Sequence, residues 1–139
     1  NKGESSLMAK NQFQVYQNNA VKTASKEQLT LMLYNGCIKF INQAIKDMEA
    51  KNFEGKNNNL QRAQDIIQEL MLTLDKSVEI SQQILPLYEY IYYQLQEGNI
   101  KNDKEYVQEA LNFVVEFRDT WQEAMLKAKK NNYAQGAQV

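Results

Sequence analysis

The sequence predicts an all-α protein: an antiparallel up-down four-helix bundle with a short N-terminal segment packed on it. Three observations support this fold class. The chain has one proline and five glycines among abundant Gln, Glu, Lys, Leu and Ala, which is a helix-forming composition. No segment alternates apolar and polar residues between turn signals, as a half-buried strand would. Apolar residues instead recur at helical spacing in four segments.

The first long helix is expected to begin at Ser25. The Ser25 hydroxyl can cap free backbone N–H groups, and Gln28, three residues later, can complete a capping box. The apolar residues that follow at spacings of one, three and four define one face, which we interpret as core. They are Leu29, Met32, Leu33, Gly36, Cys37, Phe40, Ala44 and Met48.

A second apolar row lies beside this face and consists of Leu31, Tyr34, Ile38, Ile41 and Ile45. The helix therefore carries more apolar surface than one packing face requires. Two interpretations are open. The row lines a groove for a partner helix, or it makes a wider contact with the neighbouring helices and the N-terminal segment.

A polar segment, residues 51–59, is expected to separate the first helix from the second, which ends near residues 75–78. The narrow apolar seam of the second helix is formed by Leu60, Ala63, Ile67, Leu70 and Leu74.

The third helix is expected to begin within residues 80–83 and to end at the pair Gly98 and Asn99. Pro86 should lie in or near its first turn, because farther inside it would remove a hydrogen bond and clash with the preceding turn. One face carries Ile84, Leu87, Tyr88, Ile91 and Leu95, while Tyr90, Tyr92 and Tyr93 point elsewhere and are either rim or interface residues.

The fourth helix can be capped by Asn102 or Asp103. Its heptad-like seam contains Val107, Ala110, Leu111, Val114, Phe117, Trp121, Met125 and Ala128. We interpret residues 1–7 as a leader ahead of a native start at Met8, residues 8–130 as one helical-bundle domain, and residues 131–139 as a flexible tail.

Composition argues against several classes of function. The chain has no histidine, the commonest general base and metal ligand near neutral pH, so we expect no enzyme, no metal and no cofactor. A formal charge of −1 favours neither nucleic acid nor an anionic membrane. The single cysteine, Cys37, reads as a small buried hydrophobe and fits a reducing cytoplasm. No apolar run is long enough for membrane insertion.

Several short runs resemble a known family, the flagellin-specific flagellar export chaperones (FliS). The first run comprises Tyr16, residues 21–25 and residues 29–36 (Leu-Thr-Leu-Met-Leu-Tyr-Asn-Gly). Further runs, in the same order and spacing as in that family, are residues 56–57, 63–64, 66–70, 85, 87–90 and 117–121. The resemblance extends from Phe13 to Lys127, and Pro86 departs from it.

The resemblance implies a cytoplasmic export chaperone. Such a protein binds the disordered C-terminal region of flagellin, prevents premature polymerisation and delivers flagellin to the flagellar type III secretion apparatus. It also implies that Tyr16 folds over an apolar pocket from which flagellin displaces it. We expect Leu31, Tyr34 and Ile38 to line that pocket, with Ile66, Tyr88 and Ile91 as weaker candidates.

The sequence is also compatible with other binding functions. A helical adaptor or a homodimer could use the same apolar groove on a different partner. The flagellar export gate and flagellar regulatory proteins are further candidate partners.

Overall fold

A computed structural model describes residues 24–137 of the chain, and side chains up to Tyr133. By its internal contacts the chain divides into two compact units, Asn1–Thr30 and Leu31–Val139. The described helices are α2 (Lys26–Glu49), α3 (Phe53–Thr73), α4 (Glu79–Lys101) and α5 (Lys104–Ala137). The predicted N-terminal segment, including the leader at residues 1–7 and Tyr16, lies outside the described residues.

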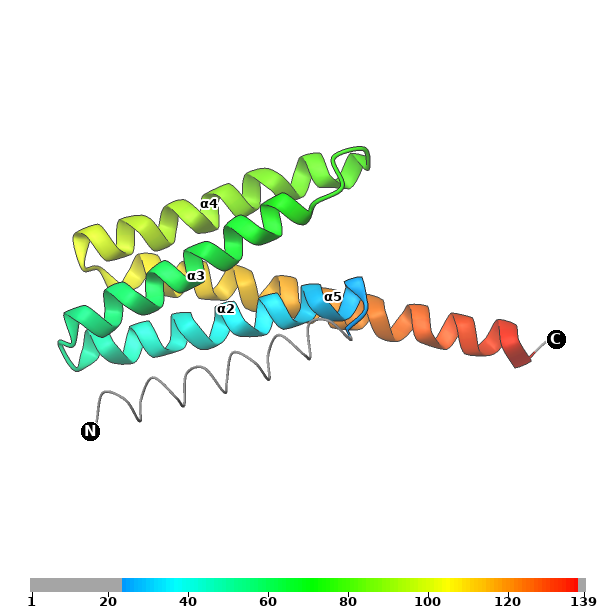
Figure 1. Cartoon of the computed structure of the whole chain (residues 1–139), viewed down its shortest axis with the longest axis horizontal. Coiled ribbons are helices and arrows are strands. Elements are labelled where there is room, and N and C mark those ends of the chain that lie inside the picture. The colour runs from blue at the N-terminus through cyan, green and yellow to red at the C-terminus, as the bar shows by residue number, and fades with distance from the viewer. Residues whose placement is uncertain (1–23, 138–139) are drawn as a thin grey trace, which may run out of the picture. The chain divides into compact units, whose positions relative to one another are not determined.

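The second unit contains α3, α4, α5 and α2 from Leu31 onward. Figure 1 shows these helices running alternately in opposite directions, joined by short connections. The predicted all-α up-down bundle is therefore confirmed for the described part of the chain. No described helix is both long and apolar enough to cross a membrane.

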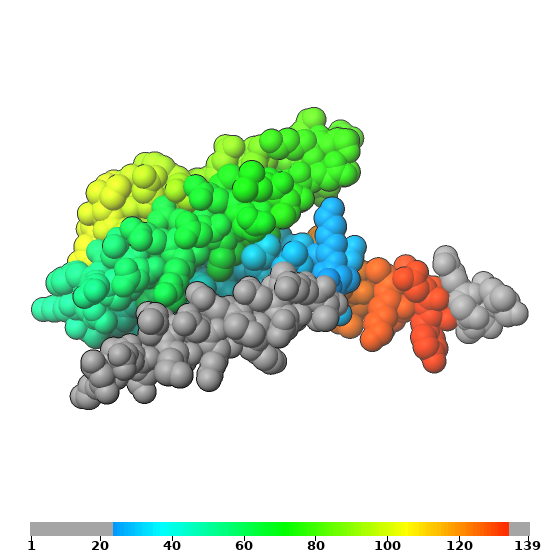
Figure 2. All heavy atoms as spheres, in the orientation of Figure 1, coloured from blue at the N-terminus to red at the C-terminus, as the bar shows by residue number. Residues whose placement is uncertain are grey.

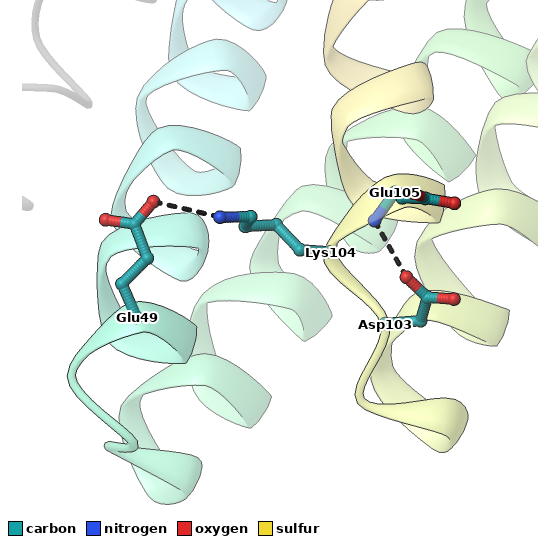
Figure 3. Close-up of polar contacts among 4 residues, drawn as sticks. All are labelled: Glu49, Asp103, Lys104 and Glu105. Carbon is teal, nitrogen blue, oxygen red and sulfur yellow. Dashed lines mark hydrogen bonds and ion pairs between the residues drawn. The ribbon is translucent and has the colours of Figure 1, made fainter.

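Two predicted helix starts are confirmed by hydrogen bonds. The Ser25 hydroxyl accepts from the Gln28 backbone N–H at 3.2 Å, while the Ser25 N–H donates to the Gln28 side chain at 3.0 Å, which completes the capping box. At the start of α5, an Asp103 carboxylate oxygen accepts from the Glu105 N–H at 3.0 Å (Figure 3). Asp103 is therefore the cap of α5.

The polar stretch at residues 51–59 is not the linker that the sequence suggested. α3 already begins at Phe53, because Asn52 accepts a hydrogen bond from the Gly55 N–H at 3.1 Å and caps the helix. The buried Lys56 amine then donates to the Asn99 carbonyl at 3.1 Å and to the Asn102 side chain at 3.2 Å. These contacts hold a segment of low helix propensity in the helical form.

Two expectations for the third helix were also wrong. Pro86 lies inside α4, seven residues after Glu79, rather than in its first turn. The helix does not end at Gly98: it continues to Lys101, and Asn102 provides the left-handed residue that ends it, with φ of 51°.

Gly98 instead permits α4 and α5 to approach closely. A Cβ atom at this position would lie 2.5 Å from the Val107 side chain and 3.2 Å from the Asp103 carbonyl oxygen. Both Gly98 and Val107 are buried. Gly98 is therefore required by packing, not by a turn.

The core of the bundle draws residues from all four described helices. It contains Tyr34, Cys37, Ile38, Ile41, Ala44, Leu60, Ala63, Ile67, Leu70, Tyr88, Ile91, Leu95, Val107, Ala110, Leu111 and Val114. α3 and α4 contact one another, and Figure 2 shows their atoms next to each other on the visible surface. Trp121 packs partly buried against the core, in agreement with its predicted structural role.

Cys37 is confirmed as a buried hydrophobe. It is fully enclosed, its sulfur lies 3.8 Å from the Ala63 carbonyl oxygen, and burial raises the pKa of its thiol.

An exposed salt bridge joins α2 and α5 at one end of the bundle. Lys104 at the start of α5 reaches Glu49 at the end of α2, with 3.3 Å between nitrogen and oxygen (Figure 3). Both side chains are more than half exposed, so this pair contributes little. The predicted flexible tail begins within α5, which continues to Ala137; its flexibility stays a prediction.

Candidate partner-binding site

The described residues contain no group of three or more Cys, Asp or Glu side chains placed to hold a metal ion. Cys37 is buried, and the α5 carboxylates Glu116, Asp119 and Glu123 are exposed on its polar side. Asp119 lies 3.0 Å from Arg118, and Glu123 lies 3.4 Å from Lys127.

The second apolar row of α2 is mostly core rather than surplus surface. Tyr34 is 4% exposed, Ile38 is 9% exposed and Ile41 is fully enclosed, while Leu31 and Ile45 are half-buried. Of the two interpretations left open by the sequence, the structure favours the wider contact with neighbouring helices. The reason is that α2 packs against several helices at once and uses more than one face.

Tyr34 and Tyr88 join α2 to α4 through their hydroxyl oxygens, which lie 2.5 Å apart in the buried interior. Phe117 of α5 stacks on Tyr34, with 6.1 Å between ring centroids, and tilts against Tyr88 at 5.2 Å. Burial raises the pKa of both tyrosines, so both are neutral at physiological pH. This aromatic cluster fixes three helices relative to one another.

The other predicted site residues are placed differently. Ile91 is fully enclosed in the core, and Ile66 is half-buried at the α2–α3 contact beside Gly36. Tyr16 lies outside the described residues. The structure therefore brings Tyr34 and Tyr88 together, whereas Leu31 and Ile66 are the predicted residues that are partly accessible. Partner binding by any of them stays a prediction.

An open apolar groove lies between α4 and α5 and adjoins the aromatic cluster through Phe117, which belongs to both. It has a volume of about 270 Å³ and is lined by Leu87, Phe113, Glu116, Phe117 and Thr120. Leu87 and Phe117 were predicted to be core residues, and the helical spacing of apolar residues does not predict this groove. The sequence feature that pointed toward this groove was the group of tyrosines on α4. One of them, Tyr90, is 38% exposed and packs edge-on against Phe113 of the groove, with 5.6 Å between ring centroids.

A second hollow, of about 370 Å³, lies between α3 and α4 and is mainly polar. Its lining consists of Gln61, Gln64, Asp65, Tyr92, Gln96, Asn99 and Ile100. Amide side chains dominate it, and it offers less apolar surface to a partner than the α4–α5 groove.

The fold and this groove define an all-α bundle protein with an apolar surface depression. Comparison with known proteins is more specific. The family model described as "Flagellar protein FliS" matches residues 8–129, so the chain belongs to the FliS family. This is a family of flagellar chaperones, a role that is not enzymatic.

Individual relatives agree with this assignment. The flagellar secretion chaperone FliS of Bacillus subtilis is 43% identical over 130 residues, covering 94% of this chain and 98% of that protein. The flagellar secretion chaperone FliS of Escherichia coli is 33% identical over 110 residues, covering 77% of this chain and 81% of the relative. A solved bacterial flagellar chaperone has the same fold, with a TM-score of 0.69 at 17% identity, covering 86% of this chain and 98% of that structure.

Proposed function

We propose that this protein is a cytoplasmic export chaperone for flagellin. It binds the disordered C-terminal region of flagellin, prevents premature polymerisation and delivers flagellin to the flagellar type III secretion apparatus. The observation that carries the proposal is the nearly full-length similarity to a flagellar secretion chaperone, at 43% identity.

The physical character of the described surface supports a binding role. Large apolar side chains are exposed on α4, among them Leu87, Tyr90 and Tyr93. Large exposed apolar side chains that lie close together are typical of an interaction site, and these three residues recur every three positions along α4. A disordered client can fold into an amphipathic helix on such a surface, and the entropy lost on ordering keeps the affinity moderate. Moderate affinity suits a client that must later be released.

Within this proposal, flagellin displaces Tyr16 from a pocket lined by Leu31, Tyr34 and Ile38, with Ile66, Tyr88 and Ile91 nearby. Leu31 and Ile66 would contact the client first, because they are only half-buried. The buried residues Tyr34 and Ile38 would contact it only after a cover has moved.

The test is binding of purified chain to full-length flagellin and to flagellin that lacks its C-terminal segment, measured by co-purification and titration calorimetry. We expect a 1:1 complex with the former and none with the latter. Equal binding of both flagellins would contradict the proposed client segment. Absence of binding to either, with light scattering showing a stable homodimer, would favour the alternative of a homodimeric interaction protein.

A further inference from the structure

The α4–α5 groove has walls that are already fixed in place. Phe117 at its base rests on Tyr34 and Tyr88 in the core. On one side, the Tyr90 hydroxyl donates to Glu109 at 2.7 Å. Leu87, on the α4 wall, is 40% exposed and points an apolar side chain to the open groove. A preformed apolar surface lowers the ordering cost of binding.

The border of the groove is acidic. On α5, Glu109, Glu116 and Glu123 recur every seven residues and therefore lie along one edge of the helix. Glu123 is paired with Lys127 at 3.4 Å, and Glu109 accepts hydrogen bonds from Tyr90 and Gln94, so Glu116 is the carboxylate among the residues that line the groove. Within residues 24–137 no hydrogen bond or ion pair engages the Glu116 carboxylate, which lines the groove.

From this geometry we propose that the α4–α5 groove docks a basic amphipathic helix of a partner protein. Its apolar edge packs on Leu87 and Phe117, and a Lys or Arg beside that edge pairs with Glu116. An apolar stripe at helical spacing matches a groove between two helices, and the acidic border favours cationic flanks over anionic ones. The inference deepens the proposed function and rests on it, since Leu87 also belongs to the α4 surface that supports client binding, and it adds the charge of the docked helix.

A second copy of this chain fits less well. The part of a second copy that could enter the groove is an exposed basic stripe on α5, which contains Leu126, Lys129, Lys130 and Tyr133. Leu126 and Tyr133 follow Phe117 by nine and sixteen residues, which places them about 160–180° around α5 from the groove. A second copy that places this stripe in the groove makes a head-to-tail contact, whereas a two-fold dimer uses the same surface on both subunits.

The experiment uses the full chain and three synthetic amphipathic peptides of Leu and Ala with Lys, Gln or Glu at the same polar positions. Binding is followed by fluorescence anisotropy. We expect the Lys peptide to bind at least tenfold more tightly than the Glu peptide, with the Gln peptide between them. The difference should shrink at high salt, because the Debye length falls to about 3 Å at 1 M. Absence of binding by all three peptides would overturn the inference.

Variants of the chain locate the site. Leu87→Asp should weaken Lys-peptide binding at least tenfold, and Glu116→Lys should remove the preference for Lys over Glu. The matched control is Leu72→Asp on α3, where the leucine is 79% exposed and away from the groove. Equal effects of Leu72→Asp and Leu87→Asp would contradict the proposal. So would a dimer of the free chain, seen by light scattering, that Leu87→Asp dissociates, because a second copy would then occupy the groove.

Discussion

At the scale of single residues, the Tyr34–Tyr88 pair couples packing to protonation. Each hydroxyl supplies the other with a hydrogen-bond partner in a region where an unpaired polar group would be costly. Burial raises the pKa of both groups above the ordinary value of 10.0; the hydrogen bond between them raises the pKa of Tyr88 further and lowers that of Tyr34 by less than burial raises it. The folded state therefore favours the protonated pair.

Alkaline titration tests this coupling. Because the folded pKa values are raised, the stabilisation is complete below pH 10 and is lost as the pH rises above it. We expect the free energy of unfolding to fall by up to about 1.4 kcal/mol per pH unit for each tyrosine. Urea unfolding at pH 8–11, followed by circular dichroism, measures the slope. The background is Cys37→Ala, because the raised thiol pKa adds its own loss from about pH 9.

The double variant Tyr34→Phe with Tyr88→Phe should flatten this slope above pH 10. The matched control is Tyr93→Phe, at a tyrosine that is half exposed. An unchanged slope in the double variant would show that the buried hydroxyls do not control alkaline stability.

Gly98 tests close packing at a single position. A methyl group there would lie 2.5 Å from Val107, which is fully enclosed and cannot move cheaply. We expect Gly98→Ala to lower the free energy of unfolding by about 1–3 kcal/mol despite the better helix propensity of alanine. Combining it with Val107→Ala should cost less than the sum of the two single changes, because the new methyl fills space that valine leaves. Strict additivity in a double-mutant cycle would refute the clash.

At the scale of elements, local signals predicted helix ends well only where the cap is local. The Ser25 capping box and the Asp103 cap involve residues within three positions, and both were readable from the sequence. The start of α3 was missed although its Asn52 cap on Gly55 is equally local, because the polar, Asn-rich residues that follow have low helix propensity and are held by a contact from Lys56 to Asn99, 43 positions away. Tertiary contact overrides propensity there.

Pro86 is a second element-scale exception. It cannot donate a backbone hydrogen bond within α4, and its ring crowds the preceding turn. The side chain is exposed, so its removal leaves no cavity. We expect Pro86→Ala to raise the free energy of unfolding by about 1–3 kcal/mol in urea titrations, with the neighbouring exposed Gln83→Ala nearly neutral. Destabilisation by Pro86→Ala would instead show that the native α4 depends on the proline.

At the scale of the whole molecule, the sequence predicted the bundle but not its open groove. Helical periodicity shows which residues face inward, and four such stripes suffice for the fold class. Helical periodicity does not show how much of each apolar stripe the neighbouring helices bury. Thus Tyr34 and Ile38 proved to be core residues, while Leu87 and Phe117, predicted as core, line a groove that exists only because α4 and α5 lie side by side.

The client should fold on the intact bundle, an expectation that rests on the proposed function. The core side chains of the described helices are already buried against one another, so these helices should change little on binding, whereas a disordered flagellin segment must become ordered. Circular dichroism of the mixture should exceed the sum of the separate spectra in helical signal. Calorimetry between 10 and 35 °C should show a negative heat-capacity change from apolar burial.

The same complex should unfold at higher denaturant concentration, with about 2.7 kcal/mol of added stability when free client is at 100 times its dissociation constant. A client segment carrying a proline at the centre of its helix is the matched control and should lose both the helical gain and the stabilisation. A spectrum equal to the sum of its parts, together with undiminished binding of the proline variant, would mean that the client binds in an extended form. Docking of an amphipathic helix would then not describe how this bundle recognises flagellin.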